Sequence, residues 1–338
     1  MNHNFKTLCF GELLLRLSTP SHLRVEQSTS FNIDYGGAEA NVAIALSNWG
    51  GETSYLTRLP FNFLGKSALK FLKYNNVDTN PSFEGGDRLG TYYLEVGIGD
   101  RGSNIEYDRA NSGMSTLKTG MIDWDKVLEN VDWFHYSGIT PALSQDAAKA
   151  CLEGVRIAKS KGITVSCDLN YRSKLWKYGD APQKWMVPLI EASDIVLGGK
   201  NDASILLGTQ FQENDGYEDV PKRIKEQFPH LKYVATNLRQ SFSATHNRIS
   251  CVITDGIETY QSRWFDMPNM LDRVGGGDAL MAGLIYGLQH FKSDLDKVVN
   301  FAGSSSCLKH SIKGDALICE LDEVLRLMEG QDSGLVQR

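Results

Sequence analysis

The fold is decided by Leu271-Asp272-Arg273-Val274-Gly275-Gly276-Gly277-Asp278-Ala279-Leu280-Met281-Ala282-Gly283. Three glycines in succession leave their backbone N–H groups uncovered, and the residues that follow have the spacing of a helix. A glycine loop that runs into a helix start is suited to binding an anion. Asp278 stands where the loop becomes helix. It is either a first-turn residue that stabilises the helix or a catalytic base beside a bound phosphate, and the stretch alone leaves both interpretations open.

Outward from this stretch, strand-like and helix-like segments alternate. A second glycine motif, Tyr35-Gly36-Gly37-Ala38-Glu39-Ala40-Asn41, opens another helix. We predict strands over 7–15, 53–59, 133–136, 163–168, 194–197 and 233–236, and helices over 65–75, 123–130, 144–161, 182–191, 278–290 and 294–309. Repeated strand–helix order predicts a mostly parallel sheet with helices on both faces, ended in antiparallel fashion by β-rich segments at 241–246, 249–254 and 258–262.

Two excursions, at about 16–34 and 90–115, interrupt this alternation. The second contains two alternating segments, 91–96 and 104–109, that predict a hairpin. Together the excursions predict a small β-sheet lid over the carboxyl ends of the parallel strands, where open α/β sheets place their ligands. We therefore expect one domain over residues 1–330 that includes this lid, followed by a frayed tail at 331–338.

Composition points away from several classes of protein. The 338 residues carry 35 Lys and Arg against 41 Asp and Glu, a net charge of -6, with no basic block. Nucleic acid and anionic membranes are therefore not expected as partners. The six cysteines are single and mostly lie in apolar runs: Cys9, Cys151, Cys167, Cys251, Cys307 and Cys319. They predict reduced core thiols, and no signal segment or long apolar run is present, so we expect a cytoplasmic protein.

The two glycine motifs together resemble the signatures of the ribokinase-like (PfkB) sugar kinases. Further matching segments follow in family order, within about residues 8–316: 10–17, 107–110, 137–143, 167–172 and 309–315. Within the family the chain is most similar to the 2-keto-3-deoxygluconate kinases. The resemblance implies a three-layer α/β/α fold with a small β-sheet lid. It also implies that ATP, with Mg²⁺, phosphorylates the terminal hydroxyl of a sugar acid, giving 2-keto-3-deoxygluconate 6-phosphate.

Phosphoryl transfer needs a cradle for the phosphates, a base for the hydroxyl proton and a device that holds the acceptor. The N–H groups of Gly275, Gly276 and Gly277 would form the cradle, and Asp278 would be the base. Because the family commonly has alanine at the position of Gly276, we expect this extra glycine only to add backbone freedom.

For the acceptor, the resemblance assigns roles to residues of both motifs and of the lid. Gly37 and Asn41 would bind sugar hydroxyls, Tyr92 and Tyr107 would be lid walls, Arg109 and Arg172 would bind the acid group, and Asp315 would close the substrate side. Two arginines suit a carboxylate because a guanidinium binds it in a bidentate manner. Their alternatives are a solvated hairpin residue and a surface ion pair.

For ATP, the resemblance points to residues that follow strands and to one residue on the last predicted helix, 294–309. They are Asn170, Thr236, Asn237, Arg239 and Asn300. Plain loop polarity, and for Asn300 a helix surface, are the alternatives. Where family members often carry Asn-x-x-Glu, this chain has Gly199-Lys200-Asn201-Asp202, so the metal ligands are unknown and Asp202 is a weak candidate that would act through water.

Two rival functions remain open at this point. The first is a kinase of the same fold that acts on a neutral sugar, such as fructose or ribose, or on a nucleoside. The second is a catalytically silent sensor of sugar acids. We also expect that the exposed edge of the lid can serve for homo-oligomer formation.

Overall fold

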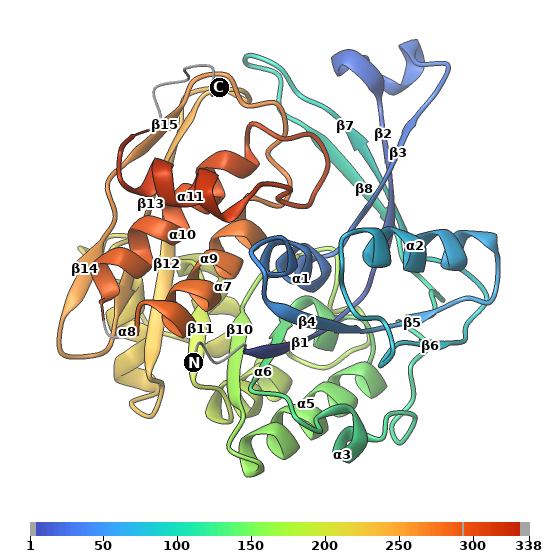
Figure 1. Ribbon diagram of the computed structural model, residues 1–338, viewed down its shortest axis with the longest axis horizontal. Coiled ribbons are helices and arrows are strands. Elements are labelled where there is room, and N and C mark those ends of the chain that lie inside the picture. The colour runs from blue at the N-terminus through green and yellow to red at the C-terminus, as the bar shows by residue number, and fades with distance from the viewer. Residues whose placement is uncertain (1–4, 293, 332–338) are drawn as a thin grey trace.

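A nine-stranded sheet forms the centre of the molecule. The computed structural model describes residues 5–292 and 294–331, so positions 332–338 of the predicted tail lie outside the described residues. The sheet order is β14-β13-β12-β11-β10-β9-β1-β4, with β15 paired to β13 (Figure 1). Its strands are β1 (Lys6–Phe10), β4 (Glu52–Leu56), β9 (Trp133–Ser137), β10 (Thr164–Asp168), β11 (Ile195–Leu197), β12 (Tyr233–Ser241), β13 (Asn247–Thr254), β14 (Thr259–Gln261) and β15 (Phe265–Met267). From β4 to β12 every pairing is parallel, and β13, β14 and β15 are antiparallel.

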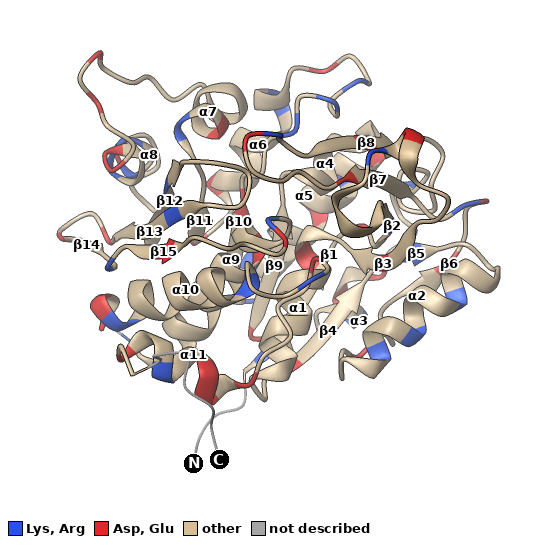
Figure 2. Cartoon of the chain, turned by 90° about the horizontal axis from the view of Figure 1, so that it is seen from above, with Lys and Arg blue, Asp and Glu red and all other residues tan. Residues whose placement is uncertain are grey.

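Helices cover both faces of this sheet (Figure 2). One layer holds α1 (Ala38–Asn48), α9 (Gly276–His290), α10 (Leu295–Lys309) and α11 (Leu321–Met328). The other holds α3 (Trp124–Val127), α5 (Gln145–Ser160), α6 (Pro182–Glu191) and α8 (Val220–Gln227), with the short α4 (Ile139–Ala142), α7 (Lys200–Asp202) and a π-turn at Ala203–Leu207. All five residues of β9 are buried, as a strand between two helix layers requires. The predicted three-layer α/β fold is confirmed.

Polar caps set the starts of several helices. Ser144 accepts a hydrogen bond from the N–H of Ala147 at the start of α5, and Asp294 accepts one from Lys297 at the start of α10. Asn62 does the same for α2 (Phe63–Tyr74), which lies beside the small sheet. Each cap satisfies a helix N–H that has no partner inside the helix.

A separate four-stranded sheet has the order β3-β2-β7-β8. It comprises β2 (Leu14–Ser18), β3 (Asn32–Gly36), β7 (Thr91–Glu95) and β8 (Asn104–Asp108), and short 3₁₀ turns at Pro20–His22 and Val25–Gln27 join β2 to β3. A two-stranded piece, β5 (Arg58–Leu59) with β6 (Phe83–Glu84), follows β4. β7 and β8 pair antiparallel, so the predicted hairpin is correct. The two excursions do form one small sheet, while the assignment of residues 1–330 to a single domain stays a prediction.

One predicted strand was too short. β12 continues to Ser241 and pairs with β13 through eight residue pairs, from Val234–Thr254 to Ser241–Asn247. Thr236, Asn237 and Arg239 therefore lie inside a strand rather than in a loop after it. Of the segment 241–246, predicted as strand, only Ser241 lies in a strand, at the end of β12, and 242–246 form the turn of this hairpin. The pairing partner of β12 lies later in the chain, so no local pattern marked its end.

All six cysteines are free, and five of them are buried. Within residues 5–292 and 294–331, no helix has the length and apolar character needed to span a bilayer.

Candidate active site

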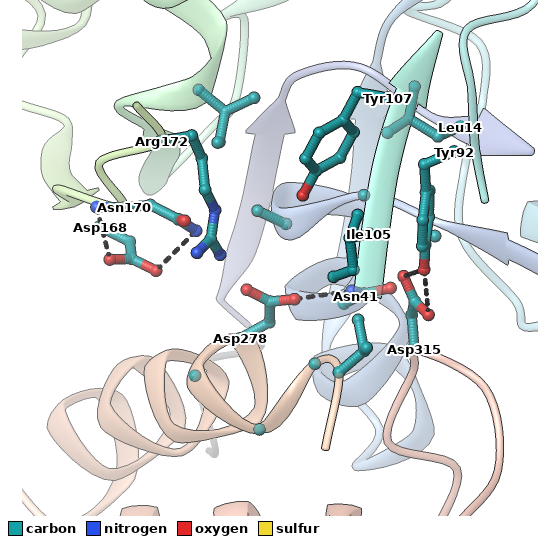
Figure 3. Close-up of a pocket in the computed structure, with 18 of the residues that line it drawn as sticks. Leu14, Asn41, Tyr92, Ile105, Tyr107, Asp168, Asn170, Arg172, Asp278 and Asp315 are labelled. Atoms are coloured by element: carbon teal, nitrogen blue, oxygen red, sulfur yellow. Dashed lines mark hydrogen bonds between the residues drawn. The ribbon is translucent and has the colours of Figure 1, made fainter. Parts of the chain in front are cut away.

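A cavity of about 520 Å³ opens between the carboxyl ends of the parallel strands, the inner face of the small sheet and the start of α9 (Figure 3). Most of the predicted site residues line it: Gly37, Asn41, Tyr92, Tyr107, Arg109, Asn170, Arg172, Asp202, Arg239, Gly275, Gly276, Gly277, Asp278 and Asp315. Thr236, Asn237 and Asn300 are not among the lining residues. Segments from both ends of the chain therefore meet in one space.

The glycine loop has the geometry that an anion site needs. Gly275 has φ 84°, in the left-handed region, and a Cβ there would lie 1.8 Å from the carbonyl oxygen of Asp315. α9 begins at the next residue, so its first N–H groups have no acceptor within the helix. A Cβ on Gly277 would meet no atom within 4 Å, so the mouth of the loop is open.

Asp278 faces the cavity from the first turn of α9. Its Oδ2 accepts a hydrogen bond of 2.7 Å from Nδ2 of Asn41, and within the described residues its carboxylate bonds to no backbone N–H of the helix. Burial raises the pKa of Asp278 to about 7, and the charge of Asp315 adds to the shift, while Asn41 and Arg172 oppose it. A carboxylate with this pKa can take up a proton at neutral pH.

The two predicted acid-binding arginines differ. Arg109 is buried, and its guanidinium pairs with Glu12 through a contact of 2.6 Å and a hydrogen bond of 2.7 Å. Ser112 donates to the other carboxylate oxygen of Glu12. Arg172 is exposed, has no hydrogen bond or ion pair through its guanidinium in the described part of the chain, and extends between Asp168 and Asp278 (Figure 3).

A buried ion network forms the wall beside the glycine loop. Arg16 of β2 contacts Asp272 at 2.5 Å and Asp315 at 2.6 Å. The hydroxyl of Tyr92 donates to Asp315 at 2.6 and 2.7 Å, and Asp272 accepts from the N–H groups of Val274 and Gly314. Asp315 is therefore already hydrogen-bonded by protein groups.

The sequence interpretation missed Glu12, Arg16 and Asp272 as parts of the site. Two signals were available. Asp272 lies in the glycine motif Leu271–Gly283. Arg16 lies two residues after Leu14, so the period of two in a strand puts Arg16 on the same face of β2 as Leu14, which lines the cavity.

The predicted nucleotide residues are spread over three places. Arg239 reaches the cavity and bonds Nε2 of His310 at 3.0 Å. Asn170 donates to Asp168 through its N–H and its Nδ2. Thr236 is buried within β12. Asn300 accepts from the N–H of Arg263 and donates to the carbonyl of Asp296, away from the cavity.

The donor set for a metal is small. Asp202 accepts hydrogen bonds from the N–H groups of Gly199 at 3.0 Å and Tyr171 at 3.3 Å, so both of its oxygens are used. Asp168 lies nearby, and burial followed by the charges of Asp278 and Asp202 raises its pKa. Among the described residues no group of three or more His, Cys, Asp or Glu is arranged to hold a metal ion. These residues fit a Mg²⁺ ion held mainly by phosphates and water, and not a site built from protein ligands.

Comparisons with known proteins agree with this geometry. The family model described as pfkB family carbohydrate kinase matches residues 4–318. A 2-dehydro-3-deoxygalactonokinase of Haloferax volcanii is 29% identical over 96% of this chain and 97% of its own. The crystal structure of 2-dehydro-3-deoxygluconokinase from Thermotoga maritima superposes with a TM-score of 0.92 at 38% identity, covering 96% of this chain and 100% of that one. A PfkB family carbohydrate kinase from Listeria grayi gives a TM-score of 0.90 at 33% identity, over 96% and 99% of the two chains. The chain belongs to the pfkB family of carbohydrate kinases.

Proposed function

We propose that the protein uses ATP to phosphorylate the terminal hydroxyl of 2-keto-3-deoxygluconate, giving the 6-phosphate. The observation that carries this proposal is that Asp278 and Arg172 line the same cavity beside the glycine loop. Asp278 has a pKa of about 7, and the guanidinium of Arg172 has no ion-pair partner within the described residues. The names of the sugar-acid kinases that the chain resembles support it.

In this reaction the acceptor hydroxyl lies against Asp278, which takes its proton as the oxygen attacks the terminal phosphorus of ATP. Asn41 holds the carboxylate in place through Nδ2, while its buried Oδ1 has no partner within the described residues and can accept from a second sugar hydroxyl. The N–H groups at the start of α9 face the charge that develops on the phosphoryl oxygens. ATP supplies the phosphoryl group, and Mg²⁺ held through water by Asp168 and Asp202 would neutralise the phosphates.

For the acid group of the substrate we propose Arg172 as the direct ligand. A neutral sugar would leave this guanidinium without a counter-charge, whereas a carboxylate pairs with it. Because Glu12 already pairs with Arg109, Arg109 would shape the wall of the cavity beside Tyr107. The guanidinium carbon of Arg109 lies 5.7 Å from the centroid of the Tyr107 ring. Thr236, Asn237 and Arg239 remain proposed nucleotide residues, and Asn300 is better explained as a helix-surface residue.

A substrate panel tests the proposal. ATP consumption would be compared with 2-keto-3-deoxygluconate, its galactonate-derived epimer, fructose, ribose and adenosine, and Asp278→Asn should abolish turnover. We expect kcat/KM to be highest for a sugar acid. A preference for a neutral sugar would contradict the acid assignment, and binding of the acid without any turnover would indicate a sensor.

Replacing Arg172 tests the acid site itself. Arg172→Gln should raise KM for sugar acids by about 10-fold or more, since a charge-assisted hydrogen bond is worth about 1.5–3 kcal/mol. The KM for neutral substrates should stay unchanged. Arg88→Gln is the matched control, because Arg88 pairs with Asp108 on the small sheet and does not line the cavity.

For assembly we propose a homo-oligomer formed through the outer face of the small sheet. This face exposes Ile33 at 66%, Phe31 at 39% and Tyr93 at 38%, with Phe31 and Tyr93 in edge-to-face contact. Clustered exposed apolar side chains beside the edge strand β3 favour association. Ile33→Lys should shift the sedimentation coefficient to that of the monomer. The free cysteines are typical of a reducing compartment and support our proposal of the cytoplasm.

A further inference from the structure

Arg109, Arg172, Arg239 and Arg273 line the cavity, and they fall into two groups. Arg109 has a carboxylate partner, while the others have none within residues 5–292 and 294–331. Arg172 belongs to the proposed acid site. Arg239 and Arg273 are both half-buried. Arg239 is a proposed nucleotide residue with no part of the nucleotide assigned to it, and Arg273 has no assigned role.

The side chain of Arg239 is held at the glycine loop by His310. Nε2 of His310 lies 3.0 Å from Nη2 of Arg239, and Nδ1 lies 2.6 Å from the carbonyl oxygen of Ser306. A carbonyl only accepts, so Nδ1 carries the proton and Nε2 accepts from Arg239. The same ring lies against Gly276, where a Cβ would be 2.4 Å from Cε1 of His310. Arg239 therefore ends next to the start of α9.

Arg273 approaches the loop along the chain, two residues before Gly275. Within the described residues its guanidinium makes no hydrogen bond or ion pair, although it is partly withdrawn from water. The pKa of Arg239 falls to about 10, first because of burial and then because of the positive charge of Arg273. Two neighbouring cations without a counter-ion are an unfavourable arrangement that a bound anion relieves.

The anion is better matched by a phosphate chain than by a carboxylate. A polyphosphate carries several negative charges and many acceptor oxygens, so it can engage both guanidinium groups and the loop N–H groups at once. A single carboxylate offers two oxygens and one charge, and Arg172 is already available for it.

We propose that Arg239 and Arg273 form a clamp on the phosphate chain of the nucleotide, and that Arg273 contacts the phosphoryl group being transferred. This inference rests on the proposed function. During transfer the bond between the acceptor oxygen and the terminal phosphorus forms, and the bond to the nucleoside diphosphate oxygen breaks. The hydroxyl proton goes to Asp278. Both arginines stay protonated and neutralise the phosphoryl oxygens, as arginines do in other phosphoryl transfers.

Calorimetric titration with ATP and AMP tests the clamp without a sugar substrate. Arg239→Gln and Arg273→Gln should each weaken ATP by about 10-fold or more and leave AMP within twofold. Arg248→Gln is the control, because Arg248 of β13 lies over the ring of Trp264 and does not line the cavity. Wild-type affinities for ATP in both glutamine variants would overturn the clamp, as would equal losses for ATP and AMP.

Steady-state kinetics give a second, independent readout. With the sugar acid that the wild-type protein prefers, Arg273→Gln should lower kcat by about 10²- to 10³-fold, with KM for the acid unchanged. A rise in that KM alone would assign the arginine to the acid and refute the clamp. If no substrate of the panel is turned over, the proposed function fails, and the ATP and AMP titrations still decide the clamp.

Discussion

Asp278 is the proposed base, and in that role its pKa would set the pH at which the protein can work. Only the ionised carboxylate can accept the hydroxyl proton, and because burial raises this pKa to about 7, the ionised form predominates only above that pH. We expect kcat/KM to rise about tenfold per pH unit below 7 and to level off above it. Asn41→Ala removes the hydrogen bond that favours the ionised form, so the rise should move to higher pH. A pH–rate series for both proteins measures this, and an unchanged midpoint in the variant would contradict the role given to Asn41.

The same carboxylate should lower the stability of the fold. The pKa of Asp278 is raised in the folded state, so the folded protein holds a proton that the unfolded chain releases near its ordinary value, and stability falls as pH rises from about 4 to about 7. One pKa unit corresponds to about 1.4 kcal/mol, so Asp278→Asn should raise the free energy of unfolding by up to about 4 kcal/mol at pH 8 and leave it unchanged at pH 4. Urea titrations at the two pH values measure this difference. A variant less stable than wild type at pH 8 would mean that the ionised carboxylate holds the loop together.

At the scale of elements, Gly276 at the start of α9 lies against His310, the residue that follows α10. The expectation that Gly276 only adds backbone freedom is wrong, because the His310 ring of the segment after α10 occupies the place of a Cβ. Gly276→Ala should therefore force the ring aside and lower the free energy of unfolding by about 1–3 kcal/mol. In Gly277→Ala the new Cβ meets no atom within 4 Å, so this variant should keep or slightly raise stability. Thermal unfolding of the two variants gives the comparison, and equal melting temperatures would show that the ring yields freely.

Local patterns predicted the elements well, and they predicted side-chain partners poorly. The glycine motifs marked the starts of α1 and α9 because a turn and a helix start depend on neighbouring residues. Arg109 pairs with Glu12 across 97 residues, and Arg16 pairs with Asp315 across 299. Such contacts depend on how β1, β2 and the loops near the C-terminus pack together, and no local spacing encodes that packing. Asn300 shows the converse error, since a polar residue on a helix bonded to its own helix four residues back.

At the scale of the molecule, Arg16 ties the small sheet to the body that carries the glycine loop. It is 2% exposed and bridges Asp272 and Asp315, while the ammonium group of Lys309 also lies close enough to influence these charges. Removing one member of a buried ion network leaves uncompensated charge, at a cost of about 3–5 kcal/mol. Arg16→Met should therefore destabilise the protein by about that amount at pH 8.

This deficit should depend on pH. Without the guanidinium the pKa of Asp315, which burial already raises, rises further, so the folded variant takes up protons that the unfolded chain does not. The gap between wild type and Arg16→Met should thus narrow as pH falls from 8 towards 5. Arg88→Met removes an exposed pair with Asp108 on the same sheet and should cost less than about 1 kcal/mol at either pH. Urea titrations of wild type, Arg16→Met and Arg88→Met test this, because equal losses of stability in the two variants would mean that the link between the sheets lies elsewhere. Partial recovery of stability in the double variant Arg16→Met, Asp315→Asn would place the link in this ion pair.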